Sequence, residues 1–447
     1  MPQTVELIVP NNGEFNVRNA AVDLGPRGSQ EYLAFGAYLA DQAVFWSTAD
    51  RVLVLPAGYD PLWFADVHDA LGLAPPPVVA PRHRTGRLVN DLLHDPVALS
   101  ALRANVADRP VRLLSWGATA ELFLLAEAVR GWGVTVQLDG VAEENHWTSL
   151  YLDSKVSCLD LARDVPGLRV PRSITVTSRD ELRGAIAAMA ARHSRVIVKS
   201  PYGVAGQGSA VVDAGDDSMA AFWATMHDDP YFRAYPLIVQ EFITHAAVAA
   251  CPALDFQVGP DGVSDLVVSA VTTAEGHLFQ SVNVGAGALP AAMVDRIVPV
   301  AHRIGAAAAD LGFRGWLCLD MIAAVDGEIY LSEINARRSG AMHSIGLLRM
   351  WRADSALTLS SHDLTAVSGP APVSYRERVR PVFQRAWSAG IRAYPTAIRG
   401  LAFPQPLMAV VAAGRTASEA EKIVADLTEE INASAGATLA TVASHAS

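Results

Sequence analysis

The chain has 447 residues, of which 51% are hydrophobic and 18% are charged, and its formal net charge at pH 7 is −11. At roughly 150 residues per domain, this length predicts about three domains, and the apolar content excludes a chain that is disordered throughout. The acidic balance excludes a bulk attraction for nucleic acid or for an anionic membrane surface. Any phosphate group must therefore be bound by a local cluster of lysines, arginines and backbone N–H groups.

The three cysteines, Cys158, Cys251 and Cys318, are far apart and form no CxxC pair. This spacing excludes a disulfide framework and a zinc site built from cysteines alone. The first residues lack the charged and apolar segments of a signal peptide, and no apolar run approaches the roughly 18 residues of a membrane span. We therefore expect a cytoplasmic protein with buried, reduced thiols and no membrane partner.

Short apolar strands and helical stretches alternate in the first third of the chain. Residues 51–55, 111–114 and 134–138 are typical of buried strands, and residues 119–130 are typical of a helix. This βαβ rhythm predicts a parallel, Rossmann-like sheet covered by helices. No GxGxxG follows any of these strands, so a dinucleotide site is not expected there.

A second region begins near Trp147. We expect an amphipathic helix over residues 151–161 that carries Lys155. Ser178 and Glu181 form a capping box that opens another helix. Two strands with a glycine-bearing loop between them are expected at residues 195–200 and 209–213.

The chain becomes rich in strands from residue 237. Strands are expected at residues 237–242, 254–258, 265–273, 277–282, 316–324 and 328–335. A helix over residues 291–311 precedes the last two of these strands, and the residues from Val373 onward form a small mixed α/β segment.

The pair Asp326-Gly327 is the strongest short hairpin signal in the sequence, because a type I′ turn requires positive φ at both central residues. A two-residue loop there places Asp320 directly opposite Glu333, and Asn335 shares their face because strand side chains alternate. The same face is expected to be apolar toward the turn. Its expected apolar members are Ile322, Ala324, Ile329 and Leu331.

An Asp, a Glu and an Asn are oxygen ligands of the kind that Mg²⁺ prefers. Two facing carboxylates repel each other unless a cation lies between them. The hairpin therefore predicts a magnesium site at Asp320, Glu333 and Asn335. The alternative is a solvated strand end on which the acids have no ligand.

Lys199 ends a strand, and the loop after it contains Gly203, Gly206, Gly208 and then Ser209. Glycines allow backbone N–H groups to approach phosphate oxygens, and the lysine adds a point charge. The loop is not a P-loop, because no lysine follows its last glycine, and not a kinase loop, whose glycines precede the lysine strand. A plain flexible hairpin is the alternative interpretation.

Three further features carry little information alone. They are Lys155, the strand end Gln240-Glu241-Phe242-Ile243, and the pair Arg337-Arg338 directly after the metal strand. Arginine suits bidentate binding of a carboxylate or phosphate.

Taken in chain order, these features resemble the ATP-grasp superfamily over roughly residues 150–340. The resemblance implies an α/β fold in which two α+β subdomains form the ATP-grasp unit. A Rossmann-like domain precedes this unit, and a small α/β C-terminal domain follows it. The implied domains are residues 1–147, 148–236 (the glycine loop), 237–370 (the metal site) and 371–447.

The resemblance also implies a role for each residue, with ATP and two Mg²⁺ ions as cofactors. Lys155 and Lys199 would bind the α- and β-phosphates, and Gly203, Gly206, Gly208 and Ser209 would close over the triphosphate. Gln240, Glu241, Phe242 and Ile243 would bind adenine, through backbone groups of Glu241 and Ile243. Asp320, Glu333 and Asn335 would hold the metal ions, and Arg337 and Arg338 would be catalytic.

The chain departs from the family pattern at two points. Its loop has fewer glycines than many members have, and no acidic residue follows the hinge to bind the ribose. His245 stands there instead and is a poor substitute.

The segments 333–340 and 381–387 are similar to peptide ligases of natural-product biosynthesis, of the pheganomycin peptide ligase type. This similarity implies an ATP-dependent ligase in antibiotic biosynthesis. Such an enzyme joins an amino acid or related carboxylate to the amine of an amino acid or peptide, through an acylphosphate. A carboxylase, a phosphotransferase and a non-catalytic ATP-binding sensor are the alternatives. No nucleic-acid partner is expected, and a homodimer is kept as one option.

Overall fold

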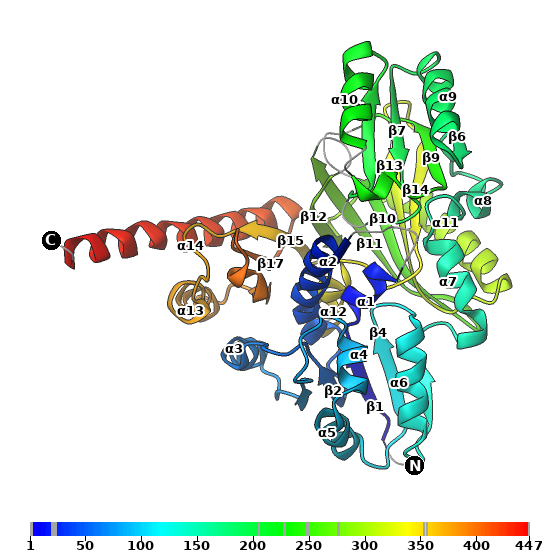
Figure 1. The fold of residues 1–447 in the computed structure, drawn as a ribbon. Helices are drawn as coiled ribbons and strands as arrows, with labels where there is room; N and C mark the ends of the chain where they lie inside the picture. Colours follow the sequence, from blue (N-terminus) through cyan, green and yellow to red (C-terminus); the bar gives the residue numbers. More distant parts are fainter. Residues whose placement is uncertain are drawn as a thin grey trace.

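Three β-sheets give the chain its architecture (Figure 1). The computed structural model describes residues 3–18, 25–203, 206–226, 229–246, 251–274, 278–351, 354 and 356–445. Within these residues, no helix has both the length and the apolar character needed to cross a membrane.

The first sheet is entirely parallel and lies at the bottom of Figure 1. Its order is β3-β2-β1-β4-β5, formed by β1 (Val5–Val9), β2 (Arg51–Val54), β3 (Val78–Val79), β4 (Val111–Ser115) and β5 (Val136–Leu138). The inner strands are buried on both faces, which is why they are continuous apolar runs. Helices α4 (Leu88–Leu93), α5 (Pro96–Val106) and α6 (Ala120–Arg130) share its core. The predicted Rossmann-like sheet is confirmed.

The second sheet has four strands and lies at the top of Figure 1. Its order is β6 (Ser173–Val176), β9 (Leu237–Glu241), β7 (Arg195–Lys199) and β8 (Ser209–Asp213). Helices α9 (Arg179–Ala190) and α10 (Asp216–Met226) pack on it through a common apolar core, and Ser178 caps α9 as expected. Because β9 pairs with both β6 and β7, the expected boundary after residue 236 falls inside this sheet. We place the boundary after Glu241 instead.

The third sheet has eight strands in the order β14-β13-β10-β11-β12-β15-β17-β16. The strands are β10 (Cys251–Gly259), β11 (Gly262–Ala274), β12 (Leu278–Gly285), β13 (Gly315–Ala323), β14 (Ile329–Asn335), β15 (Thr358–Ala366), β16 (Ala393–Ala397) and β17 (Leu407–Gly414). All of its pairs are antiparallel. The C-terminal strands β16 and β17 therefore extend the sheet that carries the predicted metal residues, rather than forming a sheet of their own.

The remaining helices pack around these sheets or extend from them. Helix α11 (Ala291–Asp310) covers β10 and β11, whereas α14 (Ala417–His445) extends away from the body (Figure 1). The others are α1 (Asn12–Val17), α2 (Gly25–Leu39), α3 (Pro61–Leu71), α7 (His146–Asp153), α8 (Cys158–Ala162), α12 (Met342–Met350) and α13 (Arg380–Ser388). Short 3-10 turns occur at Ala40–Phe45, Glu143–Asn145, Pro230–Phe232 and Arg399–Ala402, and a π-helical turn occurs at Tyr375–Val379.

Lys155 does not lie on a helix, so the expected helix over residues 151–161 is wrong. Helix α7 ends at Asp153, Ser154 is extended, and α8 begins only at Cys158. The backbone N–H of Lys155 donates to the carbonyl of Pro201 at 2.8 Å instead of forming a helical bond. Tertiary contacts therefore override the helical pattern at this point.

Candidate active site

A cleft of about 250 Å³ lies where the second and third sheets meet the N-terminal domain. Most of the predicted site residues line it. They are Lys155, Lys199, Gly206, Ser209, Gln240, Glu241, Phe242, Ile243, Asp320, Glu333, Asn335 and Arg337. Gly203, Gly208 and Arg338 are not among the residues that line it. These residues come from distant parts of the chain. Their spacing in the sequence could not show that they are neighbours, and the fold brings them together.

The two predicted phosphate lysines are both buried at the cleft. The Lys155 ammonium pairs with the carboxylate of Glu333, whereas Lys199 Nζ makes a longer contact, 3.4 Å, with Ser332 Oγ. Burial, together with the ammonium of Lys155, lowers the pKa of Lys199 to about 8. Burial also lowers the pKa of Lys155. An anion bound between the two ammonium groups would offset both effects.

The glycine loop has no room for a side chain at two of its described positions. A Cβ on Gly203 would lie 2.0 Å from the carbonyl oxygen of Gln207. Gly208 has φ of +72° and a Cβ there would lie 2.9 Å from the ring of Tyr231. These positions accept only glycine without rearrangement. Residues 204 and 205 lie outside the described residues, and closure of the loop over a triphosphate stays a prediction.

The predicted adenine hinge follows β9 along the cleft. The Glu241 N–H donates to the carbonyl of Arg172 at 3.0 Å, so this N–H is not available to a base. The Arg172 N–H donates to the Glu241 carboxylate at 2.8 Å and not to the Glu241 carbonyl. Among the backbone groups of Glu241, only the carbonyl can therefore read an adenine edge.

The hairpin of β13 and β14 has a different turn from the one expected. Its loop has three residues: the Ala324 carbonyl accepts the Gly327 N–H, the Ala324 N–H donates to Glu328, and Gly327 has φ of +83°. This is the geometry of a turn followed by a glycine in the left-handed region. The three-residue loop shifts the register by one residue relative to the two-residue turn.

A β-bulge between Asp320 and Met321 restores the register, because Ser332 is left as the extra residue on β14. The predicted pairing of Asp320 with Glu333 is therefore confirmed, although the turn that predicted it is wrong. The expected apolar face is wrong in part. Leu331 pairs with Met321, and Ile329 with Ala323, so Ile329 and Leu331 lie on the core side of the hairpin, whereas Ile322 lines the cleft.

The three predicted metal ligands lie together at the cleft. Asn335 Nδ2 donates to Asp320 Oδ2 at 2.7 Å, and the Cys318 thiol lies 3.5 Å from Asp320 Oδ1. Burial raises the pKa of Asp320. A buried carboxylate beside a second acid and an amide oxygen fits a hard divalent cation, provided that the Asn335 amide turns over. In the described chain no group of three or more His, Cys, Asp or Glu side chains is arranged for a metal; this set contains two acids and an amide.

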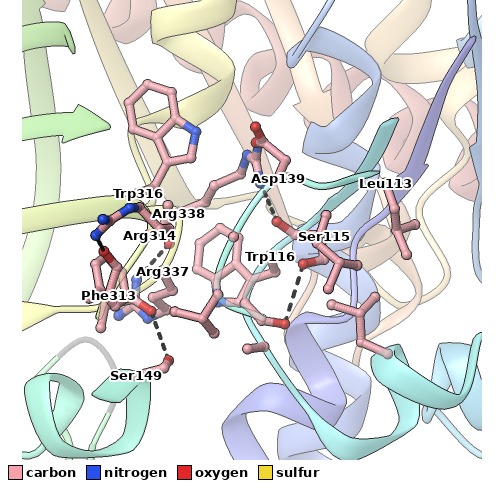
Figure 2. A pocket seen from close by; sticks show the side chains of 18 residues that line it. Leu113, Ser115, Trp116, Asp139, Ser149, Phe313, Arg314, Trp316, Arg337 and Arg338 are labelled. Atoms are coloured by element: carbon pink, nitrogen blue, oxygen red, sulfur yellow. Dashed lines mark hydrogen bonds and ion pairs between the residues drawn. The ribbon is translucent and has the colours of Figure 1, made fainter. Parts of the chain in front are cut away.

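Arg337 and Arg338 lie in different surroundings although they are adjacent in the chain. Arg337 Nη2 donates to Asn335 Oδ1 at 2.9 Å, and its guanidinium lies over the ring of Trp116 at the cleft. Arg338 points instead into a separate cavity of about 30 Å³, which Figure 2 shows. It pairs with Asp139 and donates to the carbonyl of Ser115 at 2.5 Å.

Arg338 therefore ties the end of β14 to the ends of β4 and β5 in the N-terminal domain. Its place away from the cleft does not support the expected contact with a substrate. Arg337 keeps the expected position beside the metal residues.

Sequence reasoning missed a row of polar side chains on β10 and β11. Asp255, Ser269 and Thr273 line the cleft, and Asp255 and Ser269 are almost completely buried. The available signal was the one charged residue, Asp255, in the strand at residues 254–258. A lone acid of this kind carries no motif, so only the fold could assign it to the site.

Comparisons with known proteins give no match to any protein-family model and none to a curated protein. Solved structures do match. An N5-carboxyaminoimidazole synthase from Aspergillus clavatus, in complex with ADP and an aminoimidazole ribonucleotide, has a TM-score of 0.54 at 14% identity, covering 96% of this chain and 98% of that one. A biotin carboxylase from Campylobacter jejuni, in complex with an ATP analogue, has a TM-score of 0.56 at 10% identity, covering 96% and 91%.

An L-amino acid ligase from Bacillus licheniformis has a TM-score of 0.53 at 12% identity, covering 96% of this chain and 98% of that one. At such identities the likeness shows the fold and nothing finer. The mixed α/β architecture agrees with it, including the domains that precede and follow the central unit. This chain has the ATP-grasp fold, with a Rossmann-like N-terminal domain and a C-terminal segment built onto the large sheet.

Proposed function

We propose that the protein is an ATP-dependent ligase that joins a carboxylate to an amine. The observation that carries the proposal is the convergence, in one cleft, of Lys155 and Lys199 with Asp320, Glu333 and Arg337. Two buried cations beside two acids and an arginine suit a polyphosphate and the transfer of its terminal group. Structures of this fold solved with ADP or ATP analogues support the choice of nucleotide.

The reaction begins with attack of a carboxylate oxygen of the substrate on the γ-phosphorus of ATP. The bond from this phosphorus to the bridging oxygen breaks, ADP leaves, and an acylphosphate forms. The nitrogen of a neutral amine then attacks the acyl carbon, phosphate leaves, the nitrogen loses a proton, and an amide results. The protein contributes positioning and charge, as is usual in phosphoryl transfer.

Each residue of the cleft has a place in this scheme. Lys155 and Lys199 neutralise phosphate oxygens, and Arg337 stabilises the negative charge that develops on the transferred group. Asp320, Glu333 and Asn335 would hold Mg²⁺, which draws charge from the phosphate oxygens when it is bound. The glycine loop would exclude water from the acylphosphate.

The finer proposal is a ligase whose carboxylate substrate is an amino acid and whose amine belongs to an amino acid or peptide. The fold likeness to an L-amino acid ligase supports it, as does the similarity of residues 333–340 and 381–387 to peptide ligases of the pheganomycin type. A carboxylase is the second candidate, because two of the similar structures are a carboxyaminoimidazole synthase and a biotin carboxylase.

The test measures ADP release by the full chain with ATP, Mg²⁺ and either pooled amino acids or bicarbonate, with hydroxylamine present to trap an acylphosphate as a hydroxamate. A ligase gives ADP that depends on amino acids, together with hydroxamate. ADP that depends on bicarbonate instead favours the carboxylase, and ATP binding without ADP release favours a sensor.

Glu333→Gln is the matched inactive variant, because it keeps the shape of the side chain and removes one charge. We expect it to lower ADP release about 1,000-fold, the upper scale of losing one transition-state stabiliser, while the chain stays folded. Asp69→Asn, an exposed acid on α3, should leave the rate unchanged.

A further inference from the structure

The cleft contains a carboxylate that the proposed reaction does not use. Asp255 lies on β10, is 1% exposed and lines the cleft. Within the described residues neither of its oxygens has a hydrogen-bond partner. Buried carboxylates are almost always paired, because an unpaired buried charge costs several kcal/mol. An acid left without a partner in a cleft is therefore best explained by a partner that arrives with a ligand.

A neighbouring hydroxyl is also without a partner. Ser269 on β11 is 1% exposed, lines the cleft, and its Oγ makes no hydrogen bond within the described residues. Ala253 pairs with Ser269 on one side and with Asp320 on the other, and Asp255 is two residues further along β10. Since strand side chains alternate, Asp255, Ser269 and Asp320 lie on one face of the sheet.

This cluster differs from Asp363, another buried acid that lines the cleft. Asp363 Oδ1 accepts hydrogen bonds from Gln42 at 2.8 Å and from Ser361 at 3.3 Å, so the protein itself satisfies that oxygen. Asp255 has no such support. Burial, with the nearby Asp320, raises the pKa of Asp255 to about 7, although the Ser339 hydroxyl, the Cys318 thiol and the Arg337 guanidinium lie near enough to oppose this rise. Among the described residues, no cation forms a hydrogen bond with either Asp255 oxygen, so the site has acceptors to offer to a ligand.

We infer that Asp255 and Ser269 bind the α-ammonium group of an amino acid whose carboxylate is the one that is phosphorylated, an inference that rests on the proposed function. A tetrahedral ammonium has three donors, and two carboxylate oxygens with one hydroxyl oxygen supply three acceptors. Asp255 lies one row, roughly 7 Å along the strand, from the row of Asp320, and Ser269 lies in the same row as Asp320, two strands away. An α-ammonium held there places its own carboxylate toward the metal residues and Arg337.

The second substrate, which attacks the acylphosphate, also carries an amine, but that amine does not suit Asp255 and Ser269. An acceptor nitrogen must lose a proton before it attacks, and a carboxylate partner stabilises the protonated form. The ammonium of the activated amino acid keeps its charge through both steps. The cluster therefore selects the first substrate, and it excludes carboxylates that carry no ammonium group.

The experiment compares amino acids with acids of the same shape that lack the ammonium group. The probes are L-alanine against propionate, L-leucine against 4-methylpentanoate, and L-phenylalanine against 3-phenylpropionate. Apolar probes are used because Val271, Phe279 and Val282 line the cleft beside Ser269. Binding is measured by thermal shift with a non-hydrolysable ATP analogue and Mg²⁺, and activation is measured separately as trapped hydroxamate.

We expect the wild-type chain to bind at least one amino acid much more tightly than its matched acid, and Asp255→Asn to weaken that binding about 100-fold, the scale of removing one partner of a buried charge pair. Asp255→Asn should not change the binding of the matched acid. Ser269→Ala should give a smaller loss in the same direction and is a second readout if the first variant does not fold. Asp69→Asn is the control for loss of an acid elsewhere.

Equal binding of amino acids and matched acids by the wild type would overturn the inference, and so would unchanged discrimination in Asp255→Asn. Discrimination in binding without any hydroxamate would support the ammonium site and contradict the proposed ligase. Hydroxamate formed equally well from the matched acids would support the ligase and contradict the ammonium site. No binding of any probe would contradict the inference.

Discussion

Two cavities lie beside the end of β14, and some charged groups of the larger one lack the partners that Arg338 has in the smaller one. In the smaller one (Figure 2), Arg338 pairs with the carboxylate of Asp139 and donates to the backbone carbonyl of Ser115. In the cleft, Lys199 has one long contact, and Asp255 has no partner within the described residues. From this difference we infer that the paired charge of Arg338 joins the domains, and we propose that Lys199 and Asp255 lie where a ligand binds.

Removing the paired charge of Arg338 should have the largest effect on the free energy of unfolding. Arg338→Met removes the guanidinium and leaves Asp139 with Arg112 as its remaining ion pair. We expect a loss of about 3 kcal/mol in the free energy of unfolding, the lower end for breaking a buried pair. Arg130→Met breaks an exposed pair with Glu127 and should cost less than about 1 kcal/mol. Urea unfolding of both variants measures the two values, and equal losses would contradict the assignment of Arg338 as a link between domains.

Arg337, on the cleft side, should affect chemistry instead of stability. Arg337→Lys keeps the charge and loses the planar fork, so we expect carboxylate-dependent ADP formation to slow by about one to three orders of magnitude, the scale of losing a donor to developing charge. ATP binding should weaken little, because both lysines are unchanged. Single-turnover kinetics with hydroxylamine separate the steps. Acylphosphate accumulation at the wild-type rate, with failure only in amide formation, would place this arginine at the amine site.

The uncompensated charge of Lys199 should appear as a pH dependence of ATP affinity. With a pKa of about 8, Lys199 carries its proton at pH 7, and above pH 8 it must take up a proton when phosphate binds. We therefore expect affinity to fall as the pH rises above 8, by at most about tenfold per pH unit. Titration calorimetry between pH 7 and 9.5 measures it. Lys199→Arg keeps its charge over this range and should give a flatter profile than the wild type, and a flat profile in the wild type would contradict the assignment.

The smallest effect concerns the glycine loop. Gly203, Gly206 and Gly208 leave the loop with little apolar area to bury, which is typical of a segment that opens at low free energy. We expect hydrogen exchange in Tyr202–Ser209 to slow when an ATP analogue binds, while exchange in the core strand β7 stays unchanged. Unchanged protection across the loop would argue against a triphosphate lid.

The sequence allowed the class of fold and the main strands to be predicted, because long apolar runs and the βαβ rhythm report directly on burial. The pairing of Asp320 with Glu333 was also predicted, although the loop has three residues and not the expected two. The bulge at Ser332 offsets the change of register that this longer loop causes. Turn propensities do not predict bulges, because a bulge depends on which side chains the strand directs toward neighbouring elements.

The rest of the site depended on contacts between distant segments. Lys155 was expected on a helix, yet its N–H donates to Pro201, a residue with no sequence signal for that contact. Arg338 was expected at the substrate, and only the position of Asp139 explains why it points elsewhere. Asp255 was missed because a single acid in a strand belongs to no motif. Only the fold shows that, within the described residues, its carboxylate has no hydrogen-bond partner.

The central claim is that the cleft transfers the γ-phosphoryl group of ATP to a substrate carboxylate. The most direct measurement uses an amino-acid substrate labelled with ¹⁸O in both carboxylate oxygens, followed by mass spectrometry of the released phosphate. Because the attacking oxygen stays on phosphorus when the amine displaces phosphate, the account predicts one ¹⁸O atom in each phosphate formed and one in each amide. Amide formation with unlabelled phosphate would contradict it.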